Sequence, residues 1–196
     1  MPAVDPLLIE LPQALVGDRV VVRPWRAGDG PALYEATQES LEHIAPWLPW
    51  GPVHDSPESS EKFVRRWSAR WDLREDLPMG IWNKSSGRFL GGCGLHRIDW
   101  DVRSFEIGYW VRVSQTGHGY ITEAVRLLTT LCFDSLNANR VFIRVVVENE
   151  RSKAIPKRLG FVEEGILRNS IADPEGNPRN IQVFALTPED WKNRNW

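Results

Sequence analysis

Val111-Arg-Val-Ser-Gln-Thr-Gly-His-Gly-Tyr-Ile-Thr-Glu123 joins an apolar strand pattern to a long helical pattern through a turn with two glycines. Successive backbone N–H groups at the start of a helix form a binding site for an anion, which the helix dipole strengthens. Glycine lets a phosphate group approach the backbone closely. The stretch is neither a Walker loop nor a complete dinucleotide fingerprint, because no Gly-Lys-Ser/Thr follows and the third glycine is missing. Taken alone, it predicts either a phosphate site or a tight turn between a strand and a helix.

A second informative stretch follows the β-branched run Val141–Val147, which is typical of a strand covered on both faces. Asn149 lies where this strand meets a shorter helix, so its side chain can cap the helix or hydrogen-bond an amide of a ligand. Ser152 follows on the same side of the first helical turn. Pro156 removes one backbone hydrogen bond from the helix and leaves the Ser152 carbonyl without its helical partner. If the stretch binds nothing, it is a capped and kinked helix that ends at Gly160.

The rest of the chain predicts a mixed sheet with helices packed on its faces, an α/β (α+β mixed sheet) fold. Residues 1–17 are expected to form an extended arm, and no linker divides residues 18–196, which we expect to form a single domain. Alternation and β-branched runs predict strands over residues 19–23, 78–83, 89–98, 104–111, 141–147, 161–167 and 180–186. Periodicity and capping residues predict helices over residues 29–38, 57–71, 119–136 and 149–160, with a terminal helical turn after residue 187.

Composition excludes several classes of protein. The chain has 196 residues, of which 42% are hydrophobic, and it contains 10 Trp, which together indicate a globular domain with a sizeable core. A net charge of -2 provides no basic field, so nucleic acid is not an expected partner. No run approaches 18 apolar residues and the N-terminus has no basic segment, so we expect no membrane span, no signal peptide and a cytoplasmic location. Two cysteines and four scattered histidines predict neither a disulfide framework nor a metal site.

In combination, these motifs resemble the GNAT superfamily of N-acetyltransferases, and most of all its RimJ/RimL-like branch, which acetylates the N-termini of ribosomal proteins. The resemblance covers nearly the whole chain and rests on pieces in a fixed order: Arg19-Val-Val-Val-Arg-Pro24, Pro46-Trp-Leu-Pro-Trp50, Gly91-Gly-Cys-Gly-Leu95, Glu106-Ile-Gly-Tyr-Trp110, Gly117-His-Gly-Tyr-Ile-Thr-Glu-Ala124, Asn149-x-x-Ser152 and Arg158-Leu-Gly-Phe161. It implies a central, mostly antiparallel sheet of about seven strands with one splayed parallel pair, flanked by about four helices.

The resemblance implies that acetyl-CoA binds between the expected strands 104–111 and 141–147, where their splaying leaves room for the pantetheine arm. The residues that would then contact the cofactor are Val111, Val113, Thr116, Gly117, His118, Gly119, Tyr120, Ile121, Asn149 and Ser152. Thr116 and Ile121 depart from the family pattern Gln/Arg-x-x-Gly-x-Gly/Ala. Backbone amides do not depend on the side chain, so the phosphate cradle would remain, with a lower affinity for CoA.

Glu106 is the candidate for the base that takes a proton from the acceptor amine. It lies in the middle of an expected strand among apolar residues, an environment that raises the pKa of a carboxyl group toward neutrality. The alternative is a structural carboxylate that pairs with an arginine such as Arg97 or Arg103.

Two further groups are needed for acyl transfer. A backbone N–H near Val111 or Arg112 is the candidate donor to the oxyanion. The resemblance implies that Ser152 lies near the thioester sulfur, where its hydroxyl would hydrogen-bond the departing thiolate. Tyr109 and Tyr120 are alternative donors.

The sequence predicts less about the acceptor substrate than about the cofactor. Trp47 and Trp50 stand in a loop made rigid by prolines, in the region that walls the acceptor groove in the related enzymes, so we expect them to bind substrate together with Glu106. The expected reaction is direct acetyl transfer in a ternary complex, preferably to the α-amine of a protein or peptide, by an enzyme that is a homodimer in many relatives. The alternatives are a small amine, such as an amino acid, polyamine or aminoglycoside, and a CoA-binding module without catalysis.

Overall fold

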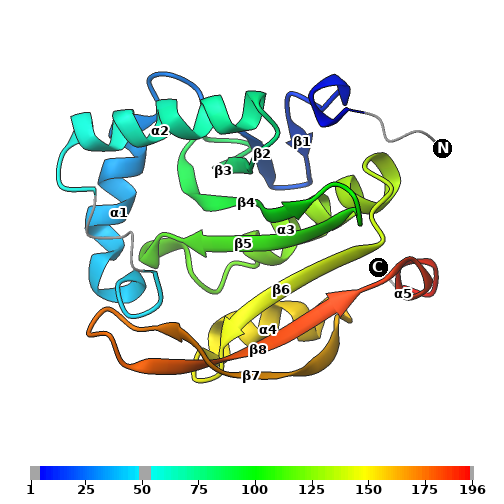
Figure 1. Cartoon of the computed structure of the whole chain (residues 1–196). Coiled ribbons are helices and arrows are strands. Elements are labelled where there is room, and N and C mark those ends of the chain that lie inside the picture. The colour runs from blue at the N-terminus through cyan, green and yellow to red at the C-terminus, as the bar shows by residue number, and fades with distance from the viewer. Residues whose placement is uncertain (1–4, 49–53, 195–196) are drawn as a thin grey trace.

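The structure is a computed structural model that describes residues 5–48 and 54–194, and these form one eight-stranded sheet with helices on both faces (Figure 1). In spatial order the strands are β1 (Leu15–Val16), β2 (Val20–Pro24), β3 (Leu77–Asn83), β4 (Phe89–Asp99), β5 (Ser104–Val111), β6 (Arg140–Val146), β8 (Pro178–Leu186) and β7 (Val162–Ala172). The α-helices are α1 (Gly30–Ile44), α2 (Pro57–Asp72), α3 (Tyr120–Thr130), α4 (Glu150–Arg158) and α5 (Pro188–Lys192). Across the described ranges, no helix is both long and apolar enough to cross a membrane.

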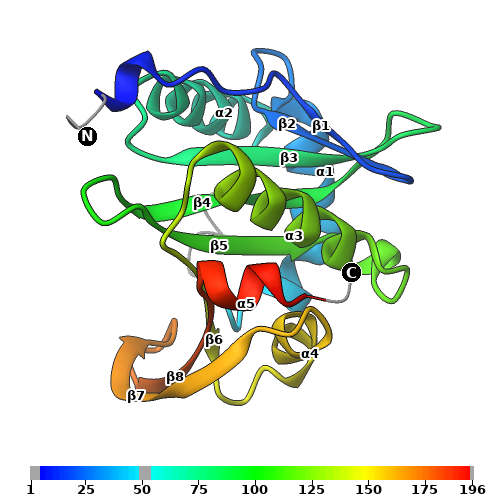
Figure 2. The ribbon, with the colours of Figure 1, turned by 90° about the vertical axis from the view of Figure 1, so that its right-hand side faces the viewer.

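The predicted mixed α/β fold is confirmed. Neighbouring strands are antiparallel except for β5 and β6, the one parallel pair within residues 5–48 and 54–194. The sheet has one strand more than the resemblance implied, because Leu15 and Val16 of the expected arm pair with β2. Helices α1 and α2 pack on one face of the sheet, and α3 and α4 pack on the other (Figure 2).

Three element boundaries differ from the sequence expectation for physical reasons. Helix α1 continues to Ile44, because Ser40 and Ile44 in its last turns are buried against the rest of the domain. The expected helix 119–136 is α-helical only to Thr130 and then widens into a π-turn over Leu131–Ser135. The β7–β8 hairpin is longer than expected because β7 continues to Ala172 past an irregularity between Leu167 and Ile171.

The parallel pair splays apart, as predicted. β5 and β6 are in register only at Ser104 with Arg140, Phe105 with Val141 and Glu106 with Phe142. Beyond Glu106 the two strands diverge toward the end of β5 that lies near α1 (Figure 1). A sheet that opens in this way leaves unpaired backbone groups on the facing edges of the two strands, which is the space that an extended ligand can fill.

The core lies on both faces of the sheet. One cluster packs between the sheet and α3, where Phe105, Leu128 and Phe184 are almost fully buried. A second cluster, with Leu33, Phe89 and Trp110, lies beneath α1 and α2. Burial of each such side chain contributes about 1.5–3 kcal/mol to the stability of the folded state. The two clusters therefore hold the sheet, including the diverging strands β5 and β6, from both faces.

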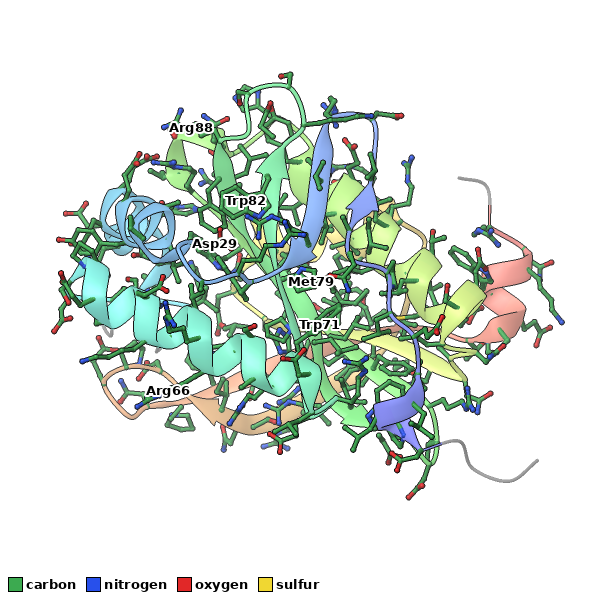
Figure 3. All side chains as sticks on the ribbon, turned by 90° about the horizontal axis from the view of Figure 1, so that it is seen from above. Asp29, Arg66, Trp71, Met79, Trp82 and Arg88 are labelled. Carbon is green, nitrogen blue, oxygen red and sulfur yellow. The ribbon has the colours of Figure 1, made fainter. Side chains whose placement is uncertain are left out.

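Two arginine clusters tie the helical layer of α1 and α2 to the sheet. The guanidinium of Arg23 stacks over the ring of Trp82 at 4.2 Å and pairs with Asp29 at 2.8 Å, and Figure 3 shows Asp29 and Trp82 side by side. Arg112, which is 2% exposed, pairs with Glu35 at 2.7 Å and hydrogen-bonds Glu39. Burial raises the pKa of Glu39, but hydrogen bonds from Ser114 and Arg112 outweigh it and lower this pKa to about 2. These contacts hold α1 against the end of β5.

Candidate active site

The loop between β5 and α3 presents a row of free backbone N–H groups. Gly117 and Gly119 both have a φ of 79°, a left-handed conformation that glycine adopts readily. Within the described ranges, no residue accepts a hydrogen bond from the N–H groups of residues 117–122. The loop ends at the N-terminus of an 11-residue helix whose cap, Gly119, has no side chain to satisfy them. This arrangement fits a phosphate or pyrophosphate group.

Arg19 fixes this loop to the sheet. Its Nη1 donates to the carbonyl of His118 at 2.8 Å, and its Nε pairs with Glu123 at 3.0 Å. Glu123 also accepts hydrogen bonds from the backbone N–H groups of Arg19 and Val20. Burial raises the pKa of Glu123, but these hydrogen bonds and the charge of Arg19 outweigh it and lower the pKa. The carboxylate therefore holds the loop in place.

The predicted cofactor residues on either side of the loop differ in what they already bind. Thr116 Oγ1 donates to the carbonyl of Val113, and the Val113 N–H donates to Ser40 Oγ at 2.9 Å. Ile121 is buried in the core, so only its backbone faces the loop. The groups that this loop offers to an anion are thus backbone N–H groups, for which the side chain is secondary.

Beyond Glu106, the edge of β5 that faces β6 is unpaired and borders the gap between the two strands, which we call the splay. The N–H of Arg112 donates to the carbonyl of Leu90 at 2.8 Å, on the β4 side. N–H directions alternate along a strand, so the N–H of Val111 points toward β6, where the pairing has ended. Of the two backbone donors considered for an oxyanion, Val111 is therefore the one that faces the gap.

Glu106 is the last residue of β5 that pairs with β6, so it lies at the apex of the splay. Its side chain is 15% exposed and forms an ion pair with Arg97 Nε at 2.7 Å. Arg97 has a φ of 43°, uncommon for a residue other than glycine, and lies at the register shift of β4. Burial raises the pKa of the Glu106 carboxyl, and the charges of Arg144, Arg97 and His96 offset part of that rise. The carboxylate is thus largely buried, with Arg97 as its ion-pair partner.

His96 and Asp76 form a dyad beside Glu106 that spacing along the chain did not predict. His96 lies opposite Glu106 in the β4–β5 ladder, and its Nδ1 is 2.6 Å from Asp76 Oδ1. The ring lies over Gly108, where an added Cβ would come within 2.8 Å of His96 Cδ2. Glycine at position 108 therefore leaves the room for an imidazole next to the carboxylate.

Tyr109 and Ser152 meet across the splay on the opposite face. The Tyr109 hydroxyl donates to the Ser152 carbonyl at 2.9 Å, and Ser152 Oγ donates to the Tyr109 oxygen at 3.2 Å. The carbonyl is free for this contact because Pro156 has no N–H to offer it. Burial raises the pKa of Tyr109, so its hydroxyl remains a donor across the neutral range. The helix-breaking proline noted in the sequence thus helps to build the site.

Asn149 and Trp47 lie at the edges of this region. Asn149 Oδ1 caps α4 by accepting from the Ser152 N–H at 3.1 Å, as predicted for one of its two alternatives. Trp47 lines a small depression with Val146 and Ile171, between the α1–α2 connection and the β7–β8 hairpin. Trp50 lies outside the described residues.

In the part of the chain that is described, no group of three or more His, Cys, Asp or Glu side chains is arranged to hold a metal ion.

Around the splay the structure brings together Glu106, Val111, Tyr109, Ser152 and Asn149. The loop of residues 116–119, the candidate phosphate loop, lies at the open end. Glu106 faces the α1 and α2 side of β5, while Tyr109 faces α4.

Comparison with known proteins agrees with this geometry. Residues 19–162 match the family model described as "Acetyltransferase (GNAT) domain". A Bacillus subtilis relative named "Putative ribosomal N-acetyltransferase YdaF" is 29% identical over 178 residues, which are 90% of this chain and 96% of that protein. The ribosomal protein uS5 alanine N-acetyltransferase of Escherichia coli is 25% identical over 188 residues, 90% of this chain and 92% of that one. The solved structure of Mycobacterium smegmatis RimJ in complex with CoA-disulfide superposes with a TM-score of 0.79 at 29% identity, over 87% of this chain and 83% of that one.

Proposed function

The chain belongs to the GNAT family of acetyl-CoA-dependent N-acetyltransferases, and on this premise we propose that it acetylates the α-amino group of a protein or peptide N-terminus. The similarity to relatives named as ribosomal-protein N-acetyltransferases over nine-tenths of the chain supports a protein acceptor. The similar structure of Mycobacterium smegmatis RimJ, solved in complex with CoA-disulfide, supports CoA binding by this fold.

The observation that supports the acceptor most strongly is the open groove beside Glu106. A groove of about 470 Å³ runs over β6, β7 and β8, lined by Ser104, Phe142, Arg144, Leu167 and Val183 among others. Ser104 and Phe142 flank Glu106 along the paired part of β5 and β6. Pockets for small molecules enclose most of the ligand surface, whereas a groove open along a sheet suits an extended chain. This favours a peptide over an isolated small amine.

In the proposed mechanism, bound acetyl-CoA supplies an activated acetyl thioester, and the residues of this chain orient the reaction. The N–H groups of residues 117–122 hold the pyrophosphate and Asn149 contacts the pantetheine arm. Glu106 accepts the proton that the α-ammonium group must lose before its nitrogen attacks. The Val111 N–H donates to the carbonyl oxygen as negative charge develops on it. The Ser152 hydroxyl, which donates to Tyr109 in the free enzyme, or the Tyr109 hydroxyl, which donates to the Ser152 carbonyl, would turn from that partner to donate to the sulfur as the C–S bond breaks.

The acceptor is tested by following CoA release with two panels side by side. One panel holds short peptides with free Ser, Ala, Met or Thr termini together with their N-terminally blocked counterparts, and the other holds amino acids, polyamines and aminoglycosides. We expect turnover with free peptides and none with the blocked ones. Turnover confined to the small amines would contradict the proposal and assign the enzyme to metabolite or antibiotic modification.

The raised pKa of Glu106 predicts the acid side of the pH–rate profile. The base acts as a carboxylate, so activity is present above its pKa and is lost as the pH falls through it. Because burial raises this pKa, the loss at saturating acceptor should occur at a higher pH than about 4.3, the ordinary value for glutamate. Measurement of kcat from about pH 3.5 to 9 checks this, and a half-maximal rate at about pH 4.3 or lower would exclude Glu106 as a base with a raised pKa.

The Tyr109–Ser152 pair predicts a second kinetic effect. Tyr109→Phe removes the hydroxyl that donates to the Ser152 carbonyl in the free enzyme and that would turn to the departing sulfur, and one lost hydrogen bond corresponds to about a tenfold lower kcat. Ser152→Ala should lower kcat as well, with little change in the KM for acetyl-CoA. If both variants retain the wild-type kcat at saturating substrates, neither hydroxyl assists the leaving group.

The proposal includes the cytoplasm as the place of action and a homodimer as the assembly. Leu7 and Leu8 in the N-terminal arm are 52% and 76% exposed, so they are available to a second copy. The mass measured by light scattering on the full chain distinguishes a monomer from a dimer.

A further inference from the structure

Arg144 lies in the acceptor groove with most of its hydrogen-bonding capacity unused. It is on β6, two residues beyond Phe142 and therefore on the same face of the strand. Its Nη2 donates to Ser170 Oγ at 3.3 Å, while its Nε is buried and has no hydrogen-bond partner in the structure. An arginine side chain has five N–H donors, and within residues 5–48 and 54–194 one of those of Arg144 is satisfied.

The neighbouring arginines differ from Arg144 because carboxylates neutralise them. Arg140, four residues earlier on the same face of β6, is paired with Glu164. Arg97 is paired with Glu106 at 2.7 Å, and Arg179 with Glu148 at 3.1 Å. For Arg144 the described chain provides no ion pair within 4.0 Å. Glu106, whose pKa the charge of Arg144 lowers, is already paired with Arg97, so the partly buried guanidinium of Arg144 has no carboxylate of its own unless another molecule supplies one.

The position of Arg144 indicates which molecule that is. The groove that it lines begins at Ser104 and Phe142, beside the base, and continues over Leu167 and Val183 toward the edge of the sheet. A peptide whose α-amine reaches Glu106 would extend along this groove. The first residues after the terminal one would then pass over Arg144, whose planar fork of N–H groups matches the two oxygens of a carboxylate.

We propose that Arg144 binds the carboxylate of an acidic side chain close behind the terminal residue of the acceptor, so that the enzyme prefers N-termini followed by Asp or Glu. This inference rests on the proposed peptide acceptor and adds its sequence class. The contact is charge-assisted and partly shielded from water, and the preference should therefore amount to about tenfold or more in kcat/KM and decline with added salt.

The alternative role for Arg144 is electrostatic. It is close enough to Glu106 to lower the pKa of that carboxyl, so it could act through the base without touching the acceptor. The two roles predict different results. Loss of a binding contact affects only acidic acceptors, whereas loss of a nearby charge affects every acceptor equally and moves the acid side of the pH–rate profile upward.

The test uses the full-length enzyme and hexapeptides that differ only by Asp or Asn at position 2, 3 or 4. For the wild type we expect the Asp peptide to exceed its Asn counterpart by about tenfold or more at one position. At a pH on the plateau of the pH–rate profile, where Glu106 is ionised with or without the Arg144 charge, Arg144→Gln should reduce this ratio to about one by lowering kcat/KM for the Asp peptide alone, and Arg144→Glu should invert it. The matched control is Arg140→Gln, which removes an arginine whose charge is already paired and should keep the wild-type ratio. Acetyl-CoA affinity, measured for each variant, reports that the fold is intact.

Three outcomes would overturn this inference. They are equal rates for Asp and Asn peptides at all three positions, equal losses for both peptides in Arg144→Gln on the plateau of the pH–rate profile, and a preference for free amino acids that disappears in Arg144→Gln. In the first two, peptides are still acetylated, so the proposed function stands and only the acidic preference fails. The third outcome assigns Arg144 to the α-carboxylate of a small acceptor and rejects the proposed function as well.

Discussion

Replacement of Glu106 by glutamine should lower kcat/KM for the acceptor about 10²-fold or more and leave acetyl-CoA affinity unchanged. The substitution keeps the size of the side chain but removes its ability to accept a proton. Glu106 lies at the apex of the splay and outside the phosphate loop, so the cofactor contacts remain. Steady-state kinetics with a peptide acceptor and calorimetric titration with acetyl-CoA measure the two quantities separately.

Glu164→Gln is the matched control for this variant. Glu164 lines the same groove and, like Glu106, forms an ion pair with an arginine, but it lies on β7 away from the splay. Its replacement should change kcat/KM by less than about tenfold, the effect of a single screened contact. Turnover of the Glu106→Gln enzyme that equals the wild type across pH 6–9 would remove Glu106 from the mechanism.

Gly117→Asp should weaken acetyl-CoA binding about 10²-fold. An aspartate at this position places a negative charge at the row of N–H groups that would hold the pyrophosphate, and two like charges about 4 Å apart near a protein surface repel each other strongly. An added Cβ at Gly117 meets no atom within 4 Å, and Asp tolerates the φ of 79° better than most residues. The loss of affinity should therefore be electrostatic and should diminish with added salt.

The variant Gly117→Asn distinguishes an effect of charge on acetyl-CoA affinity from an effect of side-chain size. Asparagine has nearly the same size and the same tolerance of a positive φ, but it is neutral. Calorimetric titration should give an affinity for acetyl-CoA close to the wild type for Asn and far weaker for Asp. Equal affinities for the two variants would mean that the phosphate groups bind elsewhere.

Local features of the sequence predicted much of the fold and part of the site. The two glycines before a helix and the cap at Asn149 each follow from neighbouring residues, and their places in the structure agree with the prediction. The β-branched run does form a strand, but the prediction that it is covered on both faces is wrong, because Phe142 and Arg144 on one face of β6 are only half-buried and line the open groove. Pro156 is the most instructive case, because the sequence indicated an unsatisfied carbonyl at Ser152 and the structure supplies the Tyr109 hydroxyl as its partner.

The features that the sequence did not predict are contacts between distant residues. Asp76 and His96 are 20 residues apart, and Arg19 and Glu123 are 104 apart. Pairs of this kind depend on sheet order and register, which local patterns do not encode. The unused donors of Arg144 are another example, since a paired and an unpaired arginine look alike in a sequence. Long-range packing likewise extended α1, whose last turns hold Glu39 against Arg112.

The most direct measurement is a competition in one vessel. The enzyme receives acetyl-CoA, a peptide with a free N-terminus and an internal lysine, and an equal concentration of spermidine, and mass spectrometry locates the acetyl group at early times. The account predicts acetylation of the peptide α-amine, with the lysine side chain and spermidine unmodified, and loss of that product in Glu106→Gln. Acetyl groups on spermidine or on the lysine side chain, with a free α-amine, would contradict it.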